Sequence, residues 1–434
     1  MKRLLLVLLT LSLLLSNLFA FASFDDIFAP DSAEETSKAL NFSLTGSVGA
    51  SVGVYFDDQV FSEQLLKVNL LADSQSFKSE VALSFHAPEN KLSADTISVT
   101  SFFDWGFIKA GLLKEEWGSG DGVHVVDVLN AFDYSKGLSD DIFSMKRAEY
   151  MLTSTIYKGP SSLQLYVKPT FTSGLASMKD KADDRWSLRP TDISATTTFT
   201  GPRTDSLEYI QFGARGRTSI GGVDLGLLYY KGHMAQPGAE PVPPTYTTMN
   251  YVYTSYQLFG TELTYVLGQF TFMAEGGYML SQDKEGNDAT LYNSKWVYLG
   301  GISYLDPTSQ LYLAFMYNGH YIQYFDQVET NAAIPITGFD VDMGQAFDRK
   351  AYGNTLTLAF EMPLFRDKVK VRLGATYQIE TEGYVLLPSI AWQVSDDLKL
   401  ECKAVAYGAM GSKESLFKTW DDNDYLTISI THFF

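Results

Sequence analysis

Apolar and polar residues alternate along most of the chain, from about residue 40 to the C-terminal end. The segment 368–379, for example, reads KVKVRLGATYQI, with a charged or polar residue at nearly every second position. Because successive side chains of a β-strand point to opposite faces, such a segment has one apolar and one polar face. Helical spacing is not sustained beyond the first 22 residues, so the pattern predicts an all-β protein.

The alternation predicts eighteen strands, joined in turn by short and long connections. Gly221-Gly222 and Asp306-Pro307 are typical of the short ones, since glycine accepts turn dihedrals and proline presets one. All the long connections fall on the opposite side: 114–148, 172–206, 232–249, 282–294, 320–350 and 409–423. The predicted strands are 40–56, 64–72, 77–86, 93–101, 105–113, 149–157, 163–171, 207–217, 222–231, 250–267, 270–281, 295–304, 309–319, 351–361, 368–379, 383–393, 398–408 and 424–433.

The length of these strands favours a membrane barrel over a soluble sandwich, which would show the same alternation. Many of them have about ten residues, the length that crosses a bilayer at a tilt. Aromatic residues such as Trp296, Tyr384 and Trp392 lie near strand ends, as in the girdles at the two membrane interfaces. We therefore predict a transmembrane antiparallel up-and-down β-barrel with short periplasmic turns and long extracellular loops.

The first 22 residues have the pattern of a cleaved export signal. Lys2 and Arg3 precede an apolar run from Leu4 to Leu15, and Ala20-Phe21-Ala22 supplies the small residues that a signal peptidase requires. We expect a signal peptide at 1–22, a periplasmic lead-in at 23–39 and the barrel at 40–434. No later apolar run is long enough to predict a membrane-spanning helix.

The last strand carries apolar residues at alternate positions that end in a terminal phenylalanine: Leu426, Ile428, Ile430 and Phe434. This arrangement resembles the signal by which outer-membrane barrels are recognised for insertion, although His432 departs from it. The resemblance implies the outer membrane as the location, its lipids as surroundings and the barrel-assembly machinery as a partner.

Two segments resemble the porin-like family of the alginate-export barrels. Residues 107–133 read FIKAGLLKEEWGSGDGVHVVDVLNAFD, similar to that family's strand, Trp-Gly loop and D-x-x-N-P-x-D segment, except that Ala131 replaces the proline. Residues 270–278 (FTFMAEGGY) resemble its strand with an inward glutamate, here Glu275. The resemblance implies an eighteen-stranded export or uptake pore, and it does not imply alginate as the solute.

Charge and cysteine content exclude several other classes. A formal charge of −18 and a pI near 4.7 argue against nucleic-acid binding, which needs a basic surface. One cysteine excludes a disulfide framework and a cysteine-based zinc site. The five histidines have no spacing known from lipases or proteases, so we predict no enzymatic activity, no cofactor and no metal site.

The polar face of each strand should line the lumen, where rings of charge select ions. Lys368, Lys370 and Arg372 would form a basic wall with Lys399 and Lys403, which favours passive passage of small hydrophilic solutes, with anions as one hypothesis. Two alternatives stay open: the charges pair with one another, or the barrel is a surface adhesin or structural barrel without transport. The predicted pore-lining residues are Lys67, Lys78, Lys109, Lys168, Arg215, Arg217, Glu275, Glu361, Lys368, Lys370, Arg372, Lys399, Glu401 and Lys403.

Overall fold

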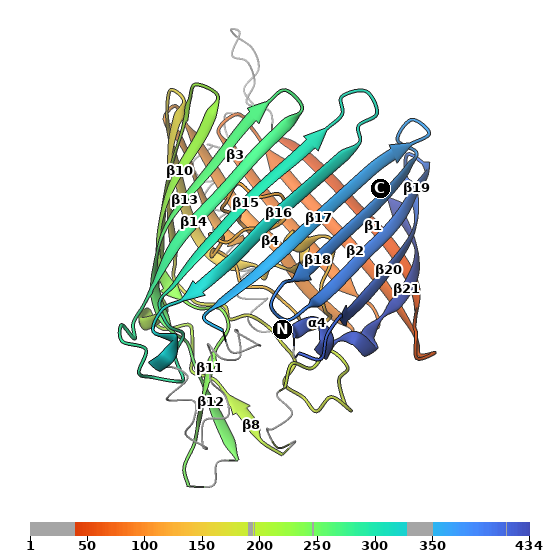
Figure 1. Cartoon of the computed structure of the whole chain (residues 1–434). Coiled ribbons are helices and arrows are strands. Elements are labelled where there is room, and N and C mark those ends of the chain that lie inside the picture. Colours follow the sequence, from red (N-terminus) through yellow and green to blue (C-terminus); the bar gives the residue numbers. More distant parts are fainter. Residues whose placement is uncertain (1–39, 190–193, 195, 245–246, 328–349, 414) are drawn as a thin grey trace. The chain divides into compact units, whose positions relative to one another are not determined.

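The computed structural model describes residues 40–189, 194, 196–244, 247–327, 350–413 and 415–434. The expected signal peptide and lead-in lie outside the described residues. Eighteen strands form one antiparallel sheet whose first and last strands pair, so the sheet closes into a barrel, as predicted (Figure 1). Within the described part of the chain, no helix has the length and apolar composition needed to cross a membrane.

Each of the eighteen predicted strands has a counterpart in the barrel, with ends that differ by a few residues. The barrel strands are β1 Asn41–Tyr55, β2 Val60–Asp73, β3 Phe77–His86, β4 Lys91–Phe103, β5 Gly106–Leu113, β6 Glu149–Lys158, β7 Ser161–Lys168, β9 Gln211–Ile220, β10 Val223–His233, β13 Ser255–Leu267, β14 Phe270–Ser281, β15 Lys295–Leu305, β16 Tyr312–Ile322, β17 Tyr352–Leu364, β18 Val369–Gln378, β19 Gly383–Ser395, β20 Leu398–Ala409 and β21 Tyr425–Phe433.

The remaining elements lie in the long connections. A separate small sheet consists of β8 Thr198–Thr200, β11 Gly238–Pro241 and β12 Thr248–Val252, with β12 between the other two. The short helices are η2 Ile142–Met145, η3 Leu207–Tyr209, α4 Leu416–Thr419 and η4 Asp421–Asn423. These pieces have only three to five residues each, too few to produce a periodic pattern, which is why the sequence did not predict them.

Strand β21 closes the barrel by pairing with β20 on one side and β1 on the other. Beyond the end of β21, Phe434 exchanges two backbone hydrogen bonds with Gly46, at 2.9 and 3.1 Å. A Cβ atom at Gly46 would lie 2.6 Å from the Phe434 ring, so only glycine leaves room for that ring. The seam is therefore fitted to the terminal residue in both backbone and side chain.

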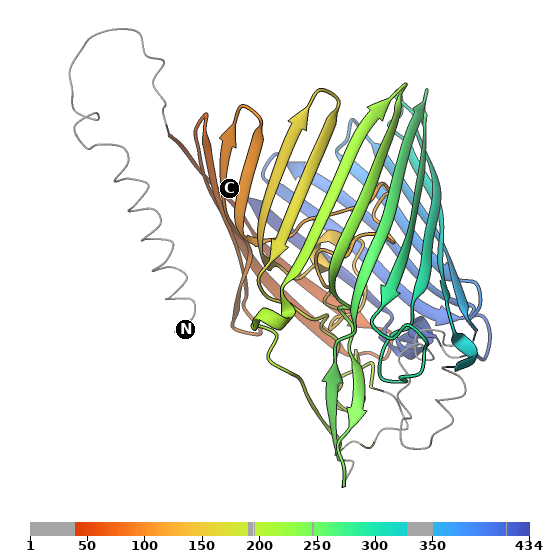
Figure 2. The same cartoon turned by 90° about the vertical axis from the view of Figure 1, so that its left-hand side faces the viewer.

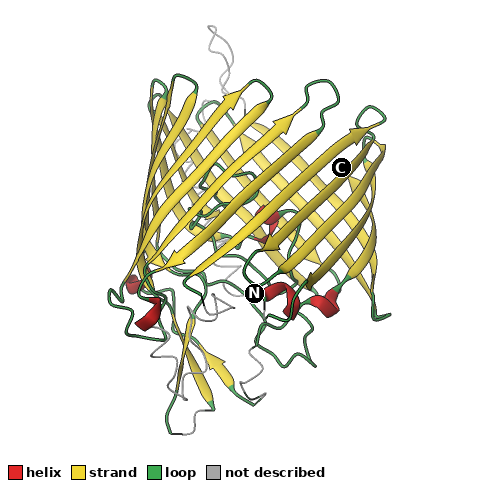
Figure 3. Ribbon diagram, in the orientation of Figure 1, coloured by secondary structure: helices red, strands yellow, loops and turns green. Residues whose placement is uncertain are grey.

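Short turns and long loops lie at opposite ends of the barrel (Figures 1 and 2). The turn between β9 and β10 has Gly221 and Gly222 at φ values of +60° and +84°, a conformation that glycine adopts without strain and that matches the twist of a hairpin. The small sheet lies at the loop end (Figure 3). This confirms the predicted alternation of connections; in outer-membrane barrels the short turns face the periplasm.

The outer face of the barrel is apolar. Leu426, Ile428, Ile430 and Phe434 are all exposed, and their role in insertion stays a prediction. Cys402 is also exposed, and it points to the opposite face from its strand neighbour Lys403. Such an apolar band is what a barrel in lipid presents.

One predicted strand, 250–267, is two strands in the structure. The chain leaves β12 at Val252 and enters the barrel at Ser255, with Thr254 fully buried between them and its carbonyl accepting a bond from the Met234 N–H at 2.8 Å. The sequence around the break, YVYTSY, keeps the residue types of a strand. The break therefore depends on a contact with another loop, which alternation does not record.

Candidate functional site in the barrel interior

The loop that follows β5 folds into the barrel. Trp117, Val126 and Leu129 on this loop have no exposed surface. The Trp117 ring meets the inward Tyr166 ring edge-on at 5.4 Å and lies over Gly213, where a Cβ atom would be 2.8 Å from it. Figure 3 shows loop segments within the ring of strands. The interior apolar core consists of Leu113, Trp117, Val126, Leu129, Met151, Tyr166, Leu228, Tyr230, Tyr256, Leu258, Met279 and Val297.

The carboxylate of Glu275 on β14 holds the tip of this loop. Its Oε1 accepts the N–H groups of Ser119 and Gly120 at 2.7 and 2.8 Å, and its Oε2 accepts those of Val125 and Val126 at 2.8 and 3.3 Å. A carboxylate suits this position because it accepts several bonds at once and charge-assisted bonds are about twice as strong as neutral ones. The predicted inward glutamate is thus an anchor for backbone.

His124 extends the same anchor. Its Nδ1 lies 2.9 Å from Glu275 Oε1, and its Nε2 lies 3.4 Å from Glu116 Oε1. Burial lowers the pKa of His124, but the hydrogen bond and charge of Glu275, with the charges of Asp127 and Glu116, outweigh burial and hold that pKa above its usual value. The geometry therefore favours an imidazolium bridging two carboxylates.

A second inward carboxylate, that of Glu262 on β13, binds the backbone where the loop tip begins, at Gly118. Its two oxygens face the Arg215 guanidinium at 2.7 and 2.8 Å, and Oε2 also accepts the Gly118 N–H at 3.0 Å. Arg217 reaches the same carboxylate at 3.1 Å. On the same side, Lys168 and Glu149 form a buried pair at 2.8 Å.

The far part of the loop contacts a different wall. The N–H of Leu138 donates to the Tyr407 hydroxyl on β20 at 3.0 Å, and Asp140 lies 2.5 Å from Lys403 on the same strand. On the β2 side, Lys136 pairs with exposed glutamates. The loop thus extends from the β13–β14 wall to the β20–β2 wall.

Two further loops meet over β19–β21 and β1. Trp186, from the 172–206 connection, packs edge-on against Tyr407 and Trp420, with ring centroids 5.9 and 5.8 Å apart. The Trp420 indole N–H donates to the Trp186 carbonyl at 3.3 Å. These contacts hold the 172–206 connection at this wall of the barrel, at its loop end.

Most of the predicted pore-lining bases have a carboxylate partner. This arrangement corresponds to the alternative in which the inward charges pair with one another. The partners are Glu80 for Lys78, Glu115 for Lys109, Glu149 for Lys168, Glu262 for Arg215 and Arg217, Glu361 for Lys370 and Arg372, Glu401 for Lys399, and Asp140 for Lys403.

The pairing is unequal on the wall of β17 and β18. Glu361 faces both Lys370, at 3.0 Å, and Arg372, at 2.6 Å, so two cations share one carboxylate. Across the seam on β2, Lys67 has no ionic partner within the described residues. The cavity beside Lys67 is also lined by Asp95, Asp396 and Asp397, so the excess of positive charge is confined to the wall of β17 and β18.

Lys368, the first residue of the predicted strand 368–379, lies outside the observed strand β18. It is exposed in the tight turn 365–368, after three residues in the left-handed region, and the extended chain resumes at Val369. The prediction that Lys368 shares the inner wall with its neighbours is therefore wrong, because alternation continues into the turn and hides the boundary.

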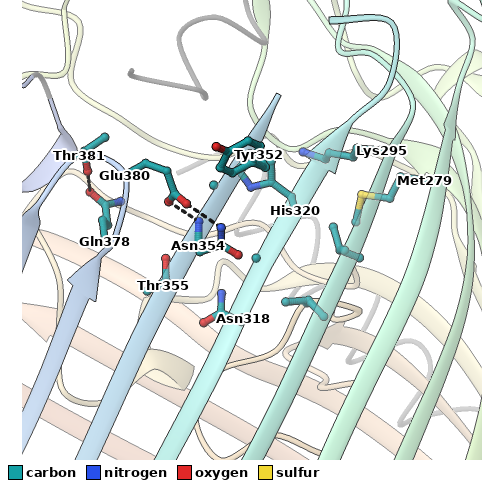
Figure 4. Close-up of a pocket in the computed structure, with 14 residues that line it drawn as sticks. Met279, Lys295, Asn318, His320, Tyr352, Asn354, Thr355, Gln378, Glu380 and Thr381 are labelled. Carbon is teal, nitrogen blue, oxygen red and sulfur yellow. Dashed lines mark hydrogen bonds between the residues drawn. The ribbon is translucent and has the colours of Figure 1, made fainter. Parts of the chain in front are cut away.

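A cavity of about 210 Å³ lies between the loop tip and the loop-side ends of β14–β18 (Figure 4). Val125 of the loop forms one side, and Asn318, His320, Thr355 and Gln378 form the polar side. A second cavity, of about 600 Å³, is lined in part by Lys67, Asn69, Ser84 and Asp95. Among the described residues, no group of three or more His, Cys, Asp or Glu side chains is placed to hold a metal ion.

Neither a protein-family model nor a curated protein matches the sequence. Among solved structures, OccK10 (OpdN) of Pseudomonas aeruginosa is similar at a TM-score of 0.53 and 9% identity, over 91% of this chain and 99% of that one. OccK11 (OpdR) of the same organism is similar at 0.51 and 9%, over 91% and 95%. A porin mutant of Rh. blastica aligns over 91% of this chain and 100% of that one at 11% identity, with a TM-score of 0.38.

The fold is that of an outer-membrane porin. At this identity the likeness concerns the fold alone. The contacts that hold the interior loop of this barrel were not predicted from the sequence. The one available signal was the run VHVVDVL at 123–129, which is apolar at irregular positions within a predicted external loop.

Proposed function

We propose that the protein is an outer-membrane channel for the passive passage of small hydrophilic solutes. The observation that carries this proposal is the uneven filling of the interior. Apolar contacts of the loop fill the β5–β15 side, whereas both cavities have polar side chains in their lining on the remaining walls. The polar side chains among these linings offer hydrogen bonds to a hydrated solute that moves along the remaining walls.

The finer part of the proposal is that anions pass more readily than cations. It is supported by Glu361, whose single carboxylate is shared by the two cations Lys370 and Arg372. Positive charge at a narrow, partly desolvated passage raises the local concentration of anions. The paired bases contribute little, because their charges are already compensated.

We further propose that the chain reaches the outer membrane after cleavage at Ala22 and inserts through its last strand. Leu426, Ile428, Ile430 and Phe434 form the apolar row that the assembly machinery would bind, and outer-membrane lipids would surround the apolar outer face. A relationship to the alginate-export barrels stays a prediction from residues 107–133 and 270–278. We expect no hydrolytic activity.

The test is reconstitution of the purified protein in planar lipid bilayers under a salt gradient. We expect stepwise conductance and a reversal potential of the sign for anions. Glu361→Gln should increase the anion preference, since Lys370 and Arg372 then lose their carboxylate. Glu80→Gln, which frees a single half-exposed lysine near a turn, is the matched control and should change it less.

The possible results test the channel and its anion preference separately. Conductance with cation preference would refute the anion part alone. Membranes that stay silent with correctly folded protein would refute the channel, and binding of host ligands by the loops without conductance would support a surface adhesin.

A further inference from the structure

The polar cavity beside the loop tip has chemistry of its own. It is lined from five neighbouring strands, β14 to β18, and Figure 4 shows Asn318 and His320 on one strand with Thr355 and Gln378 on the next two. Resting on the proposed channel function, we propose that this cavity is a binding subsite for a small neutral polyhydroxylated solute, of the size of a monosaccharide.

Two residues that line this cavity each have a buried polar atom without a hydrogen-bond partner among the described residues, which a ligand would reach once the side chain turns toward the cavity. The two atoms are Asn318 Oδ1 and His320 Nε2. Since they belong to residues i and i+2 on one face of β16, they lie roughly 7 Å apart along the strand. A buried polar atom left without a hydrogen bond costs about 1–3 kcal/mol, so a ligand that bonds both would be favoured there.

The amide of Asn318 and the imidazole of His320 favour a ligand with hydroxyl groups over one with a carboxylate. An amide side chain presents a donor and an acceptor in either orientation, and a neutral imidazole also presents one of each. A carboxylate can only accept, so it would leave the Asn318 Oδ1 acceptor unpaired. A hydroxyl both donates and accepts, and several hydroxyls on one small ring would meet Asn318, His320 and Thr355 together.

The charges at the cavity rim do not favour either sign of ligand. Both oxygens of Glu380 accept bonds from Asn354, each at 2.6 Å, as the dashed lines in Figure 4 show. At the other end, the Lys295 ammonium lies 5.6 Å from the centre of the Tyr292 ring. One acid and one base at opposite ends give the site no net charge while His320 is neutral.

Shape and volume agree with a small ring. A Cβ atom at Gly353 would lie 2.7 Å from His320 Cε1, so the glycine leaves room for the imidazole to stand in the wall. Val125, Met279 and Val297 supply an apolar side that suits the C–H face of a sugar ring. The volume of about 210 Å³ equals about seven water molecules at their liquid volume.

The experiment uses D-glucose as the neutral probe and gluconate as the anionic one. Glucose should reduce the single-channel current in a saturable way, beyond the linear effect of viscosity. Asn318→Leu should raise the half-saturating concentration at least tenfold. The matched control is Asn69→Leu, the same change at an inward asparagine on β2 that also has a buried unpartnered Oδ1, and it should leave the glucose effect unchanged.

A second measurement, titration calorimetry of the whole detergent-solubilised protein with glucose, does not depend on conductance. Silent membranes with saturable glucose binding would refute the channel and keep the site. Conductance with only a linear glucose effect and no heat of binding would refute the site and keep the channel. Block by gluconate but not glucose, lost in Asn318→Leu, would overturn the neutral class of ligand.

Discussion

The two sides of the barrel interior are built from the same alternating strands and yet are filled differently. On the β5–β15 side, a loop tip with a tryptophan and aliphatic residues excludes water and forms a core like that of a soluble domain. On the β16–β4 side, two cavities remain, and the lysines, arginines and carboxylates beside them pair while partly exposed, unlike the buried pair of Arg215 and Glu262 under the loop. The difference shows that strand alternation sets which face is inward, whereas the loop decides what that face contacts.

The loop itself repeats this contrast at its two attachments. At β14, a buried carboxylate binds four backbone N–H groups. Near β2, Lys136 pairs with Glu63 and Glu89 through side chains that are about half exposed. Three substitutions and a change of pH test whether the buried attachment at Glu275 contributes more than the exposed one at Lys136 to holding the loop. The measurement in all four cases is hydrogen exchange of residues 114–148.

The largest effect is expected for Glu275→Ala. It leaves four buried N–H groups without an acceptor, and at about 1–3 kcal/mol each the loop should lose about 4 kcal/mol or more of docking free energy. Exchange of the loop amides should accelerate strongly, and single-channel conductance should rise. Glu361→Ala, on the opposite wall, is the control; equal exchange in the two variants would contradict the assigned role of Glu275.

Trp117→Ala comes next. Truncating a fully buried tryptophan removes its contacts and leaves a cavity, at a cost of about 3–5 kcal/mol, part of which the loop can recover by moving. Loop exchange should accelerate without loss of the barrel signal in circular dichroism. Trp105→Ala, at a turn and partly exposed, should change loop exchange little; a comparable effect there would mean that the barrel as a whole was weakened.

The pH dependence is expected to be smaller. Because the pKa of His124 is raised by Glu275, Asp127 and Glu116, its stabilising contribution is complete below the ordinary histidine pKa and is lost as pH rises through the raised value. Loop protection should therefore be greatest at mildly acid pH and decline toward alkaline pH. His124→Gln should flatten this profile, and an unchanged profile would assign the titration to another group of the loop.

The smallest effect is expected for Lys136→Ala. Exposed ion pairs contribute roughly 0–1 kcal/mol and are screened by salt. The change in loop exchange should stay below that of His124→Gln and should vanish at high ionic strength. If Lys136→Ala released the loop as Glu275→Ala does, the proposed order of the two attachments would be reversed.

Much of the barrel follows from the sequence, because period-two alternation is a local signal. It predicted the strand number, the inward phase of residues such as Lys370 and Glu275, and the side on which long connections lie. It failed where contacts are not periodic. The bonds between Glu275 and the loop backbone involve N–H groups that every residue type carries, so no residue pattern marks them, and the pairing of Lys403 with Asp140 joins positions distant in the chain.

The loop that links β14 to β20 also has a mechanical consequence. A closed ring of strands can flatten into an oval when the surrounding bilayer presses on it unevenly, since its hydrogen bonds resist stretching along the ring better than bending across it. A cross-piece attached at Glu275 and at Tyr407 acts as a strut between two walls. Through this strut, lateral pressure from the lipids would reach the proposed solute path.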